Sequence, residues 1–173
     1  CKWKRYRYSL PACSPSADDE DGLRLYKMVA SQAARASDGA EGGARPSRKG
    51  RRRAAASGIV DVEAMRRACR MLEGTHDFAA FQASRGDQKG TVRTLYRCAI
   101  EPRRDTDGDA IDLVLEGDGF LYKQVRIIAG TLAMIGMGLA PAEIIDTALA
   151  DTSSLPKEEL RRNGLVGPTL PPE

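Results

Sequence analysis

The feature that most constrains the fold is an apolar stretch at residues 117–138 that begins with a Gly-Asp-Gly turn. Gly138 stands where a C-terminal helix cap is expected, and Pro141 cannot continue the same helix. Between them, apolar residues recur in steps of three and four, which is the period of one helix face: Leu121, Val125, Ile128, Leu132 and Ile135. The pattern predicts a buried helix that the chain enters from a strand through a tight turn.

One residue of this helix, Arg126, is out of place. It stands between Val125 and Ile127, where a core helix would prefer an apolar or small residue. A mostly buried guanidinium requires a carboxylate or phosphate partner, because the desolvation of an unpaired charge is costly. Arg126 is therefore a candidate functional residue, unless an internal Glu or helix-end carbonyls satisfy it.

Aromatic residues and cations alternate along residues 2–10, which predicts a strand that Pro11 ends. Lys4 and Tyr6 share one face, and Arg5 lies on the other. Such a strand can grip RNA through stacking and phosphate contacts. The alternative, which this segment alone favours, is a half-buried strand with solvated cations.

Residues 12–57 are rich in Ser, Ala, Gly and charged residues, and we interpret them as a basic, low-complexity insertion or linker. Six basic residues fall within residues 45–53, so the positive net charge of +3 comes from this one run. The charge of the whole chain therefore does not by itself indicate a nucleic-acid-binding protein. A nuclear address, a phosphate-binding arm and a solvated spacer all fit this run, and the compartment stays open.

Residues 58–173 carry the remaining elements of an α+β domain. Asp61 is a good N-cap for a helix with Val62, Met65, Ala68, Cys69 and Leu72 on one face. Phe78 and Phe81 are expected in the core. His76 and Asp77 resemble a catalytic pair, but adjacent residues rarely aim at one point, so we favour a turn or capping role for them.

Two strands are predicted after this helix, and two helices follow them. Residues 91–100 form the first, with Val92, Thr94, Tyr96, Cys98 and Ile100 on one side. Residues 111–115 form the second, antiparallel to the first because a short polar turn at residues 105–109 joins them. Besides the helix at residues 117–138, Pro141 starts a helix with Ile144, Ile145, Ala148 and Leu149 inward, and residues 153–162 hold a further short one. Helices segregated from an antiparallel sheet, on one of its faces, define the α+β class.

The cysteines and the apolar runs argue against two classes of protein. The four cysteines, at positions 1, 13, 69 and 98, show no CxxC spacing, and there is one histidine, so a zinc site is not expected. No apolar run reaches membrane-spanning length, so we expect no membrane association.

Three segments together resemble the tRNA pseudouridine synthases of the TruA type. Lys-Arg-Tyr-Arg-Tyr at residues 4–8 resembles the family's second motif, and Gly-Thr-His-Asp-Phe-Ala-Ala-Phe at residues 74–81 resembles its linker after the first helix. The run at residues 117–132 resembles the third motif almost throughout and is the most specific of the three. The similarity covers residues 2–11 and 58–173, as half of a pseudouridine-synthase-like fold.

The resemblance implies an isomerase that acts on RNA, with tRNA as the expected substrate and with no cofactor or metal. Such enzymes break the glycosidic C–N bond of a uridine, turn the base and rejoin it through carbon, using a nucleophilic aspartate. Carried over by position, Tyr6 stacks on the extruded uracil and Arg126 pairs with that aspartate. Phe120 and Val125 wall the pocket, and Lys123 contacts phosphate or is simply solvated. Family members are often dimers, so a homodimer is a further expectation.

One part of the family pattern is missing. The nucleophile belongs to a Gly-Arg-Thr-Asp-type motif upstream of the second motif, and these 173 residues contain no such motif. We therefore expect the chain to be the C-terminal part of a longer enzyme, and to be inactive alone. Two alternatives stay open: a catalytically inactive RNA-binding module of the same fold, and an α+β interaction domain in which Arg126 is structural.

Overall fold

The strands pair into one antiparallel sheet in the computed structural model, in the order β1-β4-β3-β2. The structure describes residues 3–11, 60–83, 90–103, 110–150, 166–167 and 169–170. Within these residues the strands are β1 Lys4–Pro11, β2 Gly74–Asp77, β3 Val92–Pro102 and β4 Ala110–Gly117. The helical segments are α3 Val62–Leu72, the 3₁₀ turn η1 Ala79–Phe81, α4 Gln124–Gly136 and α5 Ile144–Leu149.

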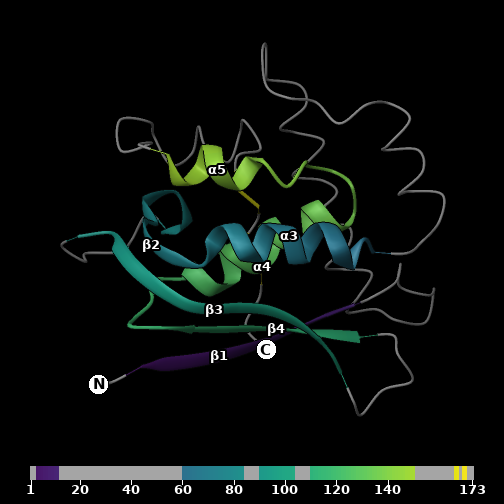
Figure 1. Cartoon of the computed structure of the whole chain (residues 1–173), viewed down its shortest axis with the longest axis horizontal. Coiled ribbons are helices and arrows are strands. Elements are labelled where there is room, and N and C mark those ends of the chain that lie inside the picture. Colours follow the sequence, from purple (N-terminus) through teal and green to yellow (C-terminus); the bar gives the residue numbers. More distant parts are fainter. Residues whose placement is uncertain are drawn as a thin grey trace.

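The helices lie on one face of the sheet, which confirms the predicted α+β class. Figure 1 shows α3 and α4 against the sheet and α5 beyond them, on the side away from the strands. The insertion predicted at residues 12–57, the turn at 105–109 and the helix at 153–162 lie outside the described residues.

The two faces of the sheet differ in chemistry, because side chains alternate along each strand. On the helix side, Tyr8, Leu113 and Ile100 form one buried row across β1, β4 and β3. On the outer side the strands carry ion pairs instead. Their N–O distances are 3.2 Å for Arg5–Glu116, 3.8 Å for Arg97–Glu116, 3.6 Å for Arg7–Asp112 and 2.6 Å for Arg97–Glu101.

The face predicted for β3 is wrong before residue 97. Leu95 is buried together with Cys98 and Ile100, whereas Tyr96 has 60% of its surface exposed. The cause is a shift in register: Leu95 pairs with Gly117 and Arg97 with Glu116, so Tyr96 is an extra residue at a β-bulge. The bulge lets both halves of β3 direct apolar side chains into the core.

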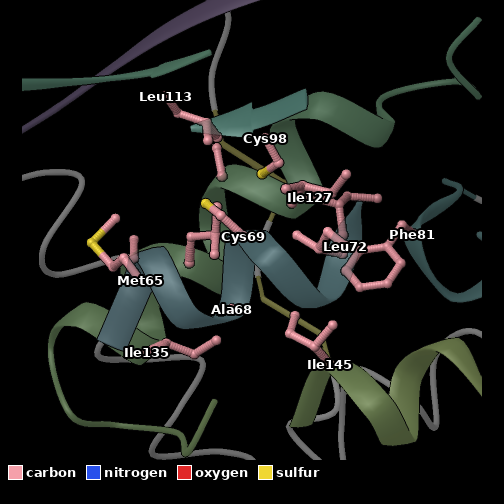
Figure 2. Packing of buried hydrophobic residues seen from close by; sticks show 14 of the residues in the cluster. Met65, Ala68, Cys69, Leu72, Phe81, Cys98, Leu113, Ile127, Ile135 and Ile145 are labelled. Carbon is pink, nitrogen blue, oxygen red and sulfur yellow. The ribbon is translucent and has the colours of Figure 1, made fainter. Parts of the chain in front are cut away.

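Helix α3 begins and packs as its sequence predicts. The Asp61 carboxylate accepts a hydrogen bond from the backbone N–H of Ala64 at 2.9 Å, which is the N-cap interaction. In Figure 2, its buried residues lie between side chains of the sheet and of α5. The labelled members of this cluster are Met65, Ala68, Cys69, Leu72, Phe81, Cys98, Leu113, Ile127, Ile135 and Ile145.

Helix α4 is buried on nearly every side, not along a single stripe. All of its residues except Val125 and Arg126 are buried. Its entry requires an unusual backbone, because Lys123 takes the left-handed conformation with φ of 59°. Its end is the predicted one: Gly138 has φ of 65°, and its N–H donates to the carbonyl of Ile135.

The linker at residues 74–83 contacts the turn at Lys123 through which the chain enters α4. Phe78 and Phe81 are fully buried, as expected. The Asp77 carboxylate accepts a hydrogen bond from the N–H of Ala79, so it caps a turn, in agreement with the role favoured for it. The Ala83 N–H donates to the carbonyl of Tyr122 and so ties the linker to the residue before Lys123.

Candidate active site

A pocket of about 600 Å³ lies where β1 meets the beginning of α4. This volume is within the range of pockets that hold small molecules. It is formed by two segments that are more than a hundred residues apart in the sequence. The residues that line it are Tyr6, Arg7, Tyr8, Phe120, Leu121, Tyr122, Lys123, Gln124, Val125 and Arg126.

Arg126 lines this pocket from the first turn of α4. Most of its surface is buried, in agreement with the expectation. The remainder is uncovered because Arg126 lies at the wall of the pocket. None of the described residues forms an ion pair or a hydrogen bond with this guanidinium. The internal partner required by a purely structural role is therefore absent from the described part of the chain.

Tyr6 and Phe120 meet at the side of the pocket. Their ring centroids are 5.0 Å apart and their planes are inclined by 80°, an edge-to-face contact. The Phe120 ring lies close to Gly117, because its Cζ atom is 3.5 Å from where a Cβ on Gly117 would stand. The contact with Phe120 restrains the Tyr6 ring. Because Tyr6 still has 43% of its surface exposed, it also offers a surface to a ligand.

The structure brings together five of the seven candidate site residues. Val125 and Lys123 line the pocket with Tyr6, Phe120 and Arg126, and the Lys123 ammonium lies 5.2 Å from the ring centroid of Tyr122. The other two are elsewhere. Lys4 is exposed and outside the lining, and Arg5 lies on the outer face of β1, paired with Glu116.

Gln124 is a pocket residue that the sequence analysis missed. It is fully buried, and its Oε1 accepts a hydrogen bond from the backbone N–H of Leu121 at 2.7 Å. The available signal was the same one that singled out Arg126, a polar side chain inside an apolar helix. Tyr8 was also missed, although its even spacing from Tyr6 places both residues on one face of β1.

Metal binding and membrane spanning find no support in the described residues. They contain no group of three or more His, Cys, Asp or Glu side chains placed to hold a metal ion. None of their helices has the length and apolar character that crossing a membrane requires.

Comparison with known proteins places the chain in a family. The family model described as tRNA pseudouridine synthase matches residues 68–168, more than half of the chain. The tRNA pseudouridine synthase A of Myxococcus xanthus is 42% identical over 114 residues, which are 66% of this chain and 38% of that protein. The proteins of the same name from Geobacillus sp. (strain WCH70) and Thermoanaerobacter sp. (strain X514) are 35% and 44% identical. These alignments cover 66% and 46% of this chain, and 41% and 31% of the relatives. The chain thus spans well under half the length of these relatives, and it belongs to the tRNA pseudouridine synthase family.

Proposed function

We propose that this chain is part of a tRNA pseudouridine synthase that isomerises uridine to pseudouridine in RNA. The observation that carries the proposal is the Arg126 guanidinium, which lines a pocket beside Tyr6 and meets no acid among the described residues. A planar fork of donors suits a carboxylate in a bidentate pair. The acid would come from a segment of the protein outside residues 1–173.

The proposed roles follow from position in the pocket. The uridine leaves its stack, at a cost of roughly a few kcal/mol, and its base stacks on the exposed surface of Tyr6. Phe120 and Val125 wall the pocket, and Arg126 orients the nucleophilic aspartate and keeps it ionised. The glycosidic C–N bond breaks, the base turns, and a C–C bond forms; the base carbon loses its proton to solvent and the freed ring nitrogen takes one up, so the product has the same composition. Lys123 and Lys4 are assigned to phosphate contacts, and the outward-facing Arg5 has no assigned role at the base.

Replacing Arg126 by Lys in the protein at its natural length tests the proposal. Lysine keeps the charge but loses the planar fork, so pseudouridine formation should fall by about 100-fold or more while the melting temperature changes little. Arg97→Lys is the matched control, because Arg97 forms its ion pairs on the outer face of the sheet, away from the pocket. An Arg126→Lys rate equal to that of this control would assign Arg126 a structural role and refute the proposed one.

The assay also separates the alternatives. Release of tritium from tRNA labelled in its uridines reports conversion directly, and residues 1–173 alone should release none. Turnover by this chain alone would contradict the assignment of the nucleophile to another segment. Binding of tRNA without conversion by the natural-length protein would favour the inactive RNA-binding module. The proposed homodimer is tested separately, by measuring the molar mass of the purified protein with light scattering as it elutes from a size-exclusion column.

A further inference from the structure

The side-chain amide of Gln124 is held in one orientation. Gln124 is the first residue of α4, and no part of its surface is exposed. Its Oε1 accepts the Leu121 N–H at 2.7 Å, and turning the amide over would bring two donors together. The hydrogen-bond network therefore fixes the oxygen toward Leu121 and the NH₂ group away from it.

The NH₂ group of this amide has no partner. Nε2 of Gln124 is the buried side-chain nitrogen or oxygen atom that lacks a hydrogen bond among the described residues. A buried donor left unsatisfied costs about 1–3 kcal/mol, and buried polar atoms in folded proteins are nearly always paired. The acceptor role toward Leu121 uses only the amide oxygen, so it does not explain the cost of the unpaired NH₂ group. The donor itself therefore requires an explanation.

We propose that Gln124 is a specificity-determining residue whose Nε2 donates a hydrogen bond to a carbonyl oxygen of the extruded uracil. This inference rests on the proposed function. Gln124 lines the same pocket as Tyr6, on which the base would stack, and uracil carries two carbonyl acceptors. Cytosine presents an amino group in place of one of them, and two facing donors repel, so this contact selects uracil if it is made at that position.

The burial of Nε2 adds a condition to this contact. No solvent reaches the atom, so the base must displace part of the pocket wall to reach it. The donor is thus hidden from water until a base enters, which preserves its full strength for the ligand.

The test is a double-mutant cycle between the protein and the RNA, in the protein at its natural length. Gln124→Met removes both hydrogen-bonding functions, and Gln124→Glu keeps the acceptor for Leu121 N–H while replacing the NH₂ group by an oxygen. Each is assayed on tRNA whose target uridine is unmodified, 2-thio or 4-thio, because sulfur is the weaker acceptor. We expect wild type to lose about tenfold in kcat/KM with one of the two thio substrates, and both variants to be insensitive to that substitution.

Each outcome decides. If the variants lose the same factor in kcat/KM on all three RNAs, and melt at a lower temperature than wild type without RNA, the proposal is overturned. The acceptor for Nε2 would then belong to another segment of the protein. Unchanged activity and melting temperature would overturn it as well, because the donor would then need no acceptor. The wild-type rate on unmodified tRNA tests the proposed function independently. If that rate is zero, the same cycle measured in Kd for the RNAs still tests the contact, and lack of coupling there also refutes it.

Discussion

Replacing Gly167 by Ala should strongly destabilise the protein, because Gly167 packs directly against the backbone of α4. Gly167 crosses α4 at Gly130 and Thr131, and its N–H donates to the Thr131 hydroxyl at 2.8 Å. A Cβ at this position would lie 2.3 Å from the carbonyl carbon of Gly130 and 2.3 Å from the backbone nitrogen of Thr131. These atoms belong to the backbone of a buried helix, so they cannot swing aside.

The magnitude follows from what must move. The crossing segment has to retreat by roughly 1 Å to restore ordinary contact distances, which breaks the hydrogen bond to Thr131 and leaves a buried N–H unpaired, at about 1–3 kcal/mol. Loosening of the fully buried Val166 and the nearly buried Leu170 adds about 1–2 kcal/mol. We therefore expect Gly167→Ala to lower the free energy of unfolding by about 2–5 kcal/mol.

Urea denaturation of the protein at its natural length measures this loss. Gly136→Ala is the matched control: its Cβ would lie 2.6 Å from the Sδ of Met65 and from a methyl group of Val60, which are side-chain atoms and not backbone. At the last residue of α4, alanine also gains helix propensity of up to about 1 kcal/mol. A Gly167→Ala cost no larger than that of Gly136→Ala would refute the reasoning from backbone contact.

Three further changes have defined outcomes. Tyr6→Phe should be mild because the ring remains, whereas Tyr6→Ala should lose about 1–3 kcal/mol of RNA binding, measured as Kd, and equal losses would exclude stacking. Asp61→Ala should cost about 1 kcal/mol in urea denaturation through loss of the N-cap, and a neutral result would contradict that role. The pKa of the Cys98 thiol is raised well above 9.0, mainly by burial and further by the neighbouring Cys69 thiol and Glu73. Its stabilising contribution is therefore complete below about pH 9 and is lost above it. The stability difference between wild type and Cys98→Ala should shrink as pH rises past 9, and a constant difference would contradict the shift.

Local chemistry made α4 and α3 predictable from sequence. Gly138 and Asp61 end and begin these helices through their own backbone or side chain, so no distant contact is needed to place them. The antiparallel pairing of β3 with β4 was equally local, because only a few residues separate the two strands in the sequence. The pairing of β1 with β4 joins segments about a hundred residues apart, so no rule of turn geometry could supply it.

The errors have a common cause, which is the dependence of burial on tertiary packing. Strict alternation along β3 ignored the bulge at Tyr96, which exists because Leu95 and Cys98 are both drawn into the core. Gln124 went unnoticed because its unpaired donor becomes visible only when every neighbouring acceptor is known.

The side chains that line the described pocket include cations but no carboxylate, and this bears on where the nucleophile of the proposed reaction comes from. No Asp or Glu stands among the described residues that line it, whereas Lys123 and Arg126 contribute two cations that form no ion pair within the described ranges. Two nearby cations lower the pKa of any carboxylate that enters, so an aspartate brought against Arg126 would be ionised at neutral pH. Under the proposed function, this pocket receives a nucleophilic aspartate from another segment, so the expected inactivity of residues 1–173 alone and the expected loss in Arg126→Lys are consequences of one arrangement.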